Sequence, residues 1–184
     1  NEFVEIFSRA WEKKTLTNHG ELHLEFEVNL SKYLGVKYLS LCSNATNGLI
    51  IAQRALNFKG DIITSPFSFI ATAHSIKWNG LKPVFVDVER QYGNLCLDKV
   101  ESAINRNTGG ILATHNYGFP GSNKELDSIS KRYGVPLLYD CAPGFGVKIE
   151  GDSITNFGDI SVLSFHATKV FTTFEGGAII SSTL

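Results

Sequence analysis

The sequence predicts an α/β fold with three layers, in which helices cover both faces of a mostly parallel sheet of seven strands. Seven short runs rich in Ile, Val, Leu and Phe recur along the 184 residues. These runs are continuous rather than alternating in polarity, which is typical of strands buried on both faces. Helix-like stretches separate most of the runs, and this alternation favours parallel strands.

The predicted strands follow one another along most of the chain. They cover 38–42, 61–65, 83–88, 110–114, 136–140, 160–165 and 177–181. Apolar residues at three- and four-residue spacing predict amphipathic helices between some of them. These helices cover 46–56, 97–104 and 122–133. No linker, internal repeat or low-complexity tract interrupts the pattern.

The N-terminal part has a different pattern. Residues 3–14 and 22–34 are predicted as two amphipathic helices, joined by a polar loop over 15–20. We therefore expect an N-terminal helical segment at 1–35 and a large α/β domain at 36–184. The chain contains no Met and stops at Leu184 shortly after an apolar run, so we expect it to be a piece of a longer protein.

Composition argues against several classes of function. The net charge of −1 implies no broad basic surface for nucleic acid. No apolar run approaches the roughly 20 residues that a membrane span needs, and no signal peptide is visible. Cys42, Cys96 and Cys141 are isolated, lack metal-site spacing and suit a reducing cytoplasm. We expect Cys141 to be a buried thiol without a reactive role.

Polar and aromatic side chains gather at the carboxyl ends of five predicted strands. The segments are 43–46, 66–69, 115–118, Asp140 and 164–169. Ligands of mostly parallel sheets bind outside the carboxyl ends of the strands. These five ends together define one candidate site better than any single motif does.

A lysine and an aspartate among these segments indicate chemistry with pyridoxal phosphate (PLP). Lys169 lies in a Ser/His/Thr-rich turn between two apolar runs, and Asp140 ends the apolar run upstream. PLP enzymes need an amine to hold the cofactor aldehyde and a carboxylate to keep the ring nitrogen protonated. The alternative interpretation of Asp140 is a cap for the next helical turn.

Two other site segments also allow two interpretations each. Small residues over 43–48 suit either a phosphate site at a helix start or an ordinary helix cap. Phe67 and Phe69 suit either an aromatic cofactor or the core.

Other kinds of site are disfavoured. No GxGxxG fingerprint follows the first strand, which argues against a dinucleotide site. No Gly-x-Ser-x-Gly elbow is present, which argues against a triad of Ser164, His166 and Asp140. His166 beside Lys169, without a Cys or Glu cluster, argues against a metal site.

Motifs spread in order over nearly the whole chain resemble the DegT/DnrJ/StrS family of sugar aminotransferases, which have PLP fold type I. They are TNHG at 17–20, EFE at 25–27, YLGV at 33–36, SNAT at 43–46, PFSFIAT at 66–72, KPVFVD at 82–87, HNYG at 115–118, DCA at 140–142, SFHATK at 164–169 and EGG at 175–177. The run over 164–178 is similar to the branch that acts on dTDP-linked keto-6-deoxyhexoses.

The resemblance implies roles for particular residues. Lys169 would hold PLP as a Schiff base, Asp140 would pair with the pyridine nitrogen, and Phe69 would stack on the ring. The phosphate would be held by the backbone of Ala45 and Thr46 and by Ser164.

The resemblance also implies the activity of the whole protein. It would transfer an amino group from glutamate to a nucleotide-linked, dTDP-type keto-6-deoxy sugar, in deoxysugar biosynthesis such as that of lipopolysaccharide O-antigen. Family members are longer, with a small C-terminal domain that would be missing here. They are homodimers in which the partner subunit contacts PLP. The expected location is the cytoplasm, without a metal, nucleic acid or membrane partner.

Three positions depart from the family pattern. Pro143 stands where the family usually has His or Gln, which bonds the phenolic oxygen of the cofactor. Gly144 is unusual at its position, and Thr172 stands where the most similar branch often has Asn. One alternative is therefore a truncated or degenerate chain that folds without turnover. A PLP sugar dehydratase is another, which Lys169 disfavours because that branch has histidine there.

Overall fold

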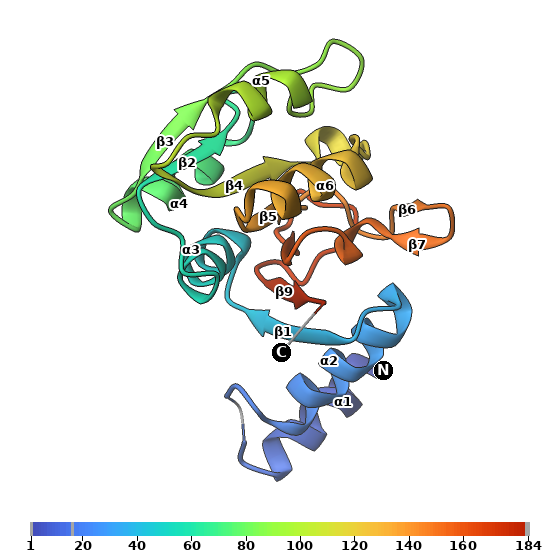
Figure 1. Cartoon of the computed structure of the whole chain (residues 1–184). Coiled ribbons are helices and arrows are strands. Elements are labelled where there is room, and N and C mark those ends of the chain that lie inside the picture. Colours follow the sequence, from blue (N-terminus) through green and yellow to red (C-terminus); the bar gives the residue numbers. More distant parts are fainter. Residues whose placement is uncertain (1, 16, 183–184) are drawn as a thin grey trace.

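The computed structural model describes residues 2–15 and 17–182, and all seven predicted strands are present in one sheet (Figure 1). The strands are β1 (Tyr38–Cys42), β2 (Asp61–Thr64), β3 (Lys82–Phe85), β4 (Thr108–Thr114), β5 (Leu137–Asp140), β8 (Ile160–Ser164) and β9 (Gly177–Ser181). Their order across the sheet is β1-β9-β8-β5-β4-β2-β3. Leu16, in the predicted polar loop, lies outside the described residues.

The sheet is mostly parallel, as predicted. Strands β3, β2, β4, β5 and β8 pair in parallel, each with its neighbour in the sheet. Strand β9 is antiparallel to both β8 and β1, so β1 again points the same way as β8. The carboxyl ends of all strands except β9 therefore lie at one edge of the sheet, where ligands bind in such folds.

Helices cover both faces of this sheet, which confirms the three-layer prediction. On one face pack α2 (Glu21–Leu34), α5 (Leu97–Ala103) and α6 (Asn123–Tyr133). On the other face pack α3 (Ala45–Ala55) and α4 (Ile70–Trp78). Successive strand residues alternate between the two cores: Leu137 and Tyr139 join the first, and Leu138 joins the second. This two-sided burial explains why the strands are continuous apolar runs.

Helix α1 (Glu2–Glu12) is attached differently. It has no buried residue. Arg9 of α1 forms ion pairs with Glu21 and Glu25 of α2, and Lys13, just after α1, forms another with Glu21. The apolar side chains of α1 remain exposed, among them Phe7 and Trp11. In Figure 1 this helix lies at the β1 edge of the molecule, away from the carboxyl ends of the central strands.

Some elements were not predicted from the sequence. Helix α4 was not predicted because its apolar residues do not share one face. Ile76 and the polar Thr72 are buried, whereas Ile70 and Trp78 are exposed. A small hairpin of β6 (Lys148–Ile149) and β7 (Asp152–Ser153), and the 3₁₀ turns η1 (Asn116–Gly118) and η2 (Ile154–Asn156), were also unpredicted. The predicted strand over 83–88 ends earlier, at Phe85.

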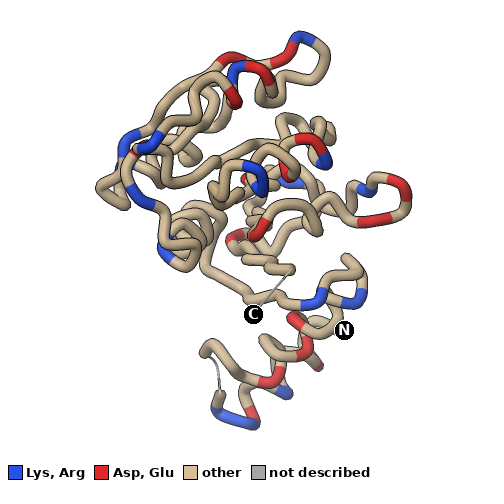
Figure 2. The backbone as a smooth tube through the Cα atoms, in the orientation of Figure 1, with Lys and Arg blue, Asp and Glu red and all other residues tan. Residues whose placement is uncertain are grey.

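Charged residues are spread over the molecule. In Figure 2 both Lys or Arg and Asp or Glu occur in many parts of the molecule, on helices and on loops. None of the described helices combines the length and apolar character that crossing a membrane requires.

Candidate active site

Two cavities open at the carboxyl edge of the sheet and share a wall. A cavity of about 640 Å³ lies against the start of α3, and one of about 370 Å³ lies beyond the end of β4. The shared wall consists of Phe69, Asp140, Ala142 and Lys169. We call the two cavities together the cleft. The lysine and aspartate singled out from the sequence therefore face the same space.

Asp140 is the last residue of β5, and its carboxylate is held in place on both oxygens. The Thr72 hydroxyl donates to Oδ2 at 2.7 Å, and the Ala142 N–H donates to Oδ1 at 3.1 Å. The side chain is buried, and burial raises the pKa of this carboxyl. Both hydrogen bonds and the charge of Lys169 act in the opposite direction. A buried carboxylate of this kind is stabilised by a further cationic N–H donor.

Lys169 lies in the turn that follows β8. Its backbone N–H donates to the His166 carbonyl at 2.9 Å, which closes the turn. The side chain is half-buried and lines both cavities. It is therefore placed as an amine within a pocket rather than as a fully solvated surface charge.

The start of α3 forms one end of the larger cavity. Asn44 caps the helix by accepting from the Asn47 N–H at 2.9 Å. Ala45, Thr46 and Ser164 line the cavity beside it. The first N–H groups of a helix have no intrahelical acceptor, and they favour an anion. Capping and an anion site, posed as alternatives from the sequence, are thus compatible at this helix.

Gly177 allows this close arrangement. A Cβ atom built on Gly177 would lie 2.7 Å from the Leu163 carbonyl oxygen and 3.0 Å from the Ala45 nitrogen. Both are backbone atoms and cannot move aside easily. The second glycine of the EGG motif therefore lets β9 and the start of α3 approach each other.

The two phenylalanines of the β2–α4 connection are not core residues. Phe69 is 75% exposed and Phe67 is 47% exposed. Phe69 immediately precedes α4 and borders both cavities, whereas Phe67 borders the smaller one. Core burial, one of the two interpretations from sequence, is wrong for both rings.

Ser164, His166 and Asp140 do not form a triad. The His166 ring bonds Thr168 at 2.9 Å and pairs with Glu175 at 3.6 Å. The Ser164 hydroxyl accepts from the His166 backbone N–H. Asp140 is occupied by Thr72 and Ala142, so no histidine ring connects the serine to the acid.

His115 lies outside the cleft, although its segment was predicted at the site. Its ring is buried and stacks on Tyr139, with 4.5 Å between ring centroids and 5° between planes. Burial lowers the pKa of His115 to about 4. The next two residues, Asn116 and Tyr117, do line the smaller cavity. Because the chain turns into η1 directly after His115, one segment serves both the core and the site.

Sequence reasoning missed two hydroxyl side chains at the site. Thr72 holds Asp140 although 68 residues separate them. Thr114 pairs in register with Asp140 on the adjacent strand and lines the smaller cavity. Its hydroxyl has no hydrogen-bond partner among the described residues. The threonine in the PFSFIAT motif was a signal for Thr72, whereas Thr114 resembles any other strand residue.

The residues present fit PLP. The cleft offers an amine at Lys169, a buried acid at Asp140, an exposed ring at Phe69 and helix N–H groups for a phosphate. Cys141, beside Asp140, is buried and burial raises the pKa of its thiol, which suits an unreactive thiol. Over the ranges that the structure describes, no three His, Cys, Asp or Glu side chains are grouped as metal ligands would be.

Comparison with known proteins agrees with this geometry. A transaminase of dTDP-4-amino-4,6-dideoxy-D-glucose from Shigella dysenteriae is 46% identical over 97% of this chain and 49% of its own length. The crystal structure of DesI with its TDP-sugar product matches with a TM-score of 0.94 at 34% identity, over 98% of this chain and 46% of DesI. NtdA from Bacillus subtilis, with bound cofactor PMP, matches with a TM-score of 0.89 at 29% identity, over 100% of this chain and 43% of NtdA.

The chain spans about half the length of the curated relatives it matches. The model of the DegT/DnrJ/EryC1/StrS aminotransferase family matches residues 1–183, almost every residue of the chain. The fold agrees with the neighbours of fold type I. The chain therefore belongs to the DegT/DnrJ/EryC1/StrS aminotransferase family.

Proposed function

We propose that the protein is a PLP-dependent aminotransferase that moves an amino group from glutamate to a dTDP-linked 4-keto-6-deoxy sugar. The observation that carries this proposal is the common wall of the two cavities, where Lys169 and the buried Asp140 face the same space. The names of the relatives from Shigella dysenteriae and Escherichia coli support the sugar and the nucleotide.

Lys169 has two tasks in this proposal. When bound, PLP supplies an electrophilic aldehyde and an electron sink. The Nζ atom of Lys169 is the group that would hold the aldehyde of the cofactor. The same amine would also serve as a general base and acid that moves a proton during transamination. A lysine in a turn bordering both cavities is suitably placed for both tasks.

Asp140 keeps a proton on the ring nitrogen. Thr72 and Ala142 orient the carboxylate, and an anion at this position raises the pKa of a nearby pyridine nitrogen. Thr72 acts through Asp140 and is therefore a positioning residue.

The remaining residues bind and orient. Phe69 would cover one face of the cofactor ring, and Ala45, Thr46 and Ser164 would bind its phosphate. Pro143 lines the smaller cavity, and its side chain has no hydrogen-bond donor for the phenolic oxygen of the cofactor. Thr114 lines the same cavity, and its hydroxyl oxygen is buried without a hydrogen-bond partner among the described residues.

The organisation of the whole protein is also part of the proposal. Residues 1–35 form the N-terminal helical segment and 36–184 the PLP-binding large domain. The complete gene product is a cytoplasmic homodimer in which a partner subunit covers the open cleft, because exclusion of water strengthens the electrostatic contacts inside. Sedimentation of the complete gene product tests this point, and a monomer with full activity would contradict it.

The activity is tested with the PLP-loaded complete gene product. Glutamate should shift the visible absorbance of lysine-bound PLP, and subsequent addition of a dTDP-4-keto-6-deoxyhexose should restore it. Mass spectrometry should then find the dTDP-4-amino sugar. A folded protein without a visible PLP band would favour the degenerate homologue. Loss of a sugar hydroxyl without gain of nitrogen would favour the dehydratase.

A further inference from the structure

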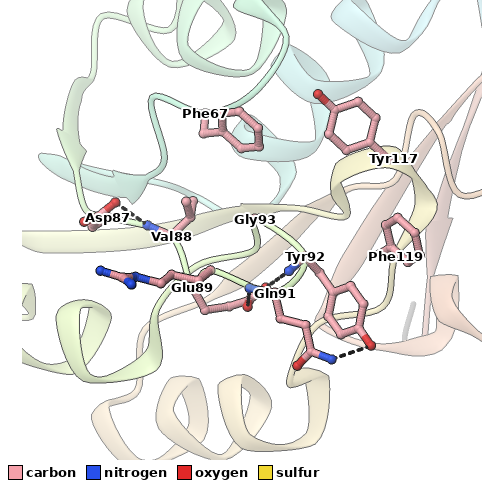
Figure 3. Close-up of a pocket in the computed structure, with 10 residues that line it drawn as sticks. Phe67, Asp87, Val88, Glu89, Gln91, Tyr92, Gly93, Tyr117 and Phe119 are labelled. Carbon is pink, nitrogen blue, oxygen red and sulfur yellow. Dashed lines mark hydrogen bonds between the residues drawn. The ribbon is translucent and has the colours of Figure 1, made fainter.

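The start of α4 is open toward the cleft. Phe69 of the cleft immediately precedes this helix, and a phenylalanine at the N-cap position offers no oxygen to the first N–H groups. Thr72, in the first turn, bonds Asp140. A third cavity of about 550 Å³ adjoins the cleft, and Figure 3 shows the rings of Phe67 and Tyr117 at its border. Contacts on the buried side therefore decide where this helix start lies.

Three hydrogen bonds lead from α3 to Asp140 on the buried side. The side-chain amide of Gln53 donates to the Ser75 hydroxyl at 2.7 Å. That hydroxyl donates to the Thr72 carbonyl at 2.8 Å. The Thr72 hydroxyl then donates to Asp140 Oδ2 at 2.7 Å. We call Gln53, Ser75 and Thr72 the tether, because they connect the interface of the two helices with the acid of the cleft.

All members of the tether are removed from water. Gln53 is 1% exposed, and Ser75 and Thr72 are 0% exposed. The same two helices contribute apolar residues to the surrounding core, namely Leu49, Ala52 and Ile76. Hydrogen bonds in such surroundings are stronger than in water. A movement of Ser75 would break bonds that water cannot replace, so the first turn of α4 is held in one position.

Gln53 is a costly residue at its position. A buried side-chain amide loses its bonds to water, and an apolar residue of similar size avoids that loss. Gln53 regains part of it by donating to the Leu49 carbonyl at 3.1 Å as well as to Ser75. Its Oε1 atom is buried without a hydrogen-bond partner among the described residues. Stability of the core does not account for an amide here, whereas a role in holding Ser75 does.

Helix α3 is a suitable anchor for the tether. It packs so closely on the sheet that a Cβ atom built on Gly48 would lie 2.8 Å from the Val162 side chain. A second attachment joins it to the far end of α4, where the Asn79 side chain accepts from Arg54 Nε at 2.7 Å. Helix α4 is therefore fastened to α3 at both ends, and the tether is the attachment nearer the cleft.

We propose that Gln53 and Ser75 are positioning residues of the active site, which fix Thr72 and thereby the direction of the Asp140 carboxylate. The inference rests on the proposed function, in which Asp140 faces the ring nitrogen of PLP. A carboxylate keeps a proton on that nitrogen only while it is close and aligned. The tether therefore sets how strongly the nitrogen holds its proton, although Gln53 lines neither cavity of the cleft.

The test compares two variants with the parent as PLP-loaded complete gene product. Gln53→Met keeps the length of the side chain without its donor, and Ser75→Ala removes the central hydroxyl. The ¹⁵N chemical shift of ring-labelled PLP, followed against pH, reports protonation of the ring nitrogen. Both variants should lower the pKa of this nitrogen by about 0.4 to 1.5 and slow the glutamate half-reaction roughly 2- to 30-fold, the range for changes along a series of packed contacts.

A second measurement uses the protein without cofactor. The hydrogen bond from Thr72 lowers the pKa of Asp140, so both variants should raise this pKa. NMR of protein with ¹³C-labelled aspartate carboxyl groups measures it, and Asp140→Asn identifies the signal. In a Thr72→Val background, Gln53→Met should have no further effect on either pKa, because the tether is already broken.

Ser130→Ala is the matched control. Ser130 is also buried, and its hydroxyl donates to the Val135 carbonyl at 2.7 Å on the other face of the sheet. Urea unfolding should show a loss of stability in Ser130→Ala as in Ser75→Ala, but both pKa values should stay at those of the parent.

Parent-like pKa values in Gln53→Met and Ser75→Ala would overturn the inference, and so would a full effect of Gln53→Met in the Thr72→Val background. In either case, a lower pKa of the ring nitrogen in Asp140→Asn would leave the proposed function standing. An unchanged pKa of that nitrogen in Asp140→Asn would overturn the proposed role of Asp140 as well.

Discussion

Helices α1 and α3 are both 11 residues long, yet the fold uses them in opposite ways. Helix α1 has no buried residue and contacts α2 through ion pairs at the surface. Helix α3 has a side-chain cap, buries Gly48, Leu49, Ala52 and Gln53, and forms one end of the cleft. The difference shows that an amphipathic pattern specifies a helix but not how firmly the rest of the fold holds it.

This comparison predicts that changes around α3 and the strand ends have large effects, whereas changes in α1 have small effects on this chain.

The change expected to have the largest effect is Lys169→Ala. Transamination by the complete gene product should fall roughly 10⁴-fold, the upper range for losing a positioned proton-transfer group. The visible PLP band should disappear while circular dichroism stays unchanged. Lys77→Ala, on the exposed side of α4, is the control, and a borohydride-reducible PLP adduct in Lys169→Ala would contradict the role.

Asp140→Asn should have the next largest effect. It keeps the shape of the side chain but removes the negative charge, so the ring nitrogen loses its proton more easily. We expect turnover to fall about 10²- to 10³-fold, in line with an electrostatic contact to the reacting system, while PLP remains bound. Thr72→Val removes only the 2.7 Å hydrogen bond to Asp140 and should lower turnover less than Asp140→Asn does. Parent-like turnover in Asp140→Asn would show that another group contacts the ring nitrogen.

His115 should make the stability of the α/β core depend on pH. The buried ring has a pKa of about 4, below the ordinary 6.5, because burial disfavours its charged form. The unfolded chain therefore binds more protons between pH 6.5 and 4. The free energy of unfolding should fall as pH decreases through this window, by roughly 3 kcal/mol in total, and should be unaffected by His115 above it.

His115→Phe keeps the stacked ring on Tyr139 and removes the titration. Urea unfolding at pH 7 and pH 4.5 should show a smaller loss of stability in this variant than in the parent. Asp140 acts in the opposite sense, because burial raises its pKa, so the difference between the two proteins is the relevant quantity. Exposed His74 supplies the control His74→Gln. Equal losses in parent and His115→Phe would exclude His115 as the cause.

Gly48→Ala tests how closely α3 packs on the sheet. A Cβ atom there would lie 2.8 Å from Val162 and 3.2 Å from the Cys42 sulfur. Alanine otherwise favours a helix, but this contact should push α3 from the sheet and lower the free energy of unfolding by about 1–3 kcal/mol. Denaturant unfolding of the parent and of Gly48→Ala measures this loss of stability. A gain of stability would mean that the neighbouring side chains move aside.

The smallest effect is expected in α1. Phe7→Ser removes an exposed ring that stacks on Trp11 at 6.2 Å. The free energy of unfolding of this chain should change by at most about 0.5 kcal/mol, as for other exposed positions. A loss above 2 kcal/mol would show that the helix is held more firmly than its contacts indicate, and would remove the contrast with α3.

Local pattern alone predicted much of this protein. The seven strands, five of the helices, and the pairing of Lys169 with Asp140 at strand ends could all be predicted from sequence, because apolar runs, helical spacing and strand-end residues are properties of neighbouring positions. The family is also indicated by the sequence motifs, each of which is a short run of adjacent residues. Helix α4 was the exception, since both of its faces carry apolar residues and no period distinguishes them.

Only the tertiary structure decided which of these residues meet. Contacts between distant segments decide the order of the strands and the hydrogen bond from Thr72 to Asp140 across 68 positions. They also leave the Thr114 hydroxyl without a partner among the described residues and direct the His115 ring away from the cleft. Such contacts arise from packing of the whole chain, and a local pattern carries no information about which distant side chain fills the neighbouring space.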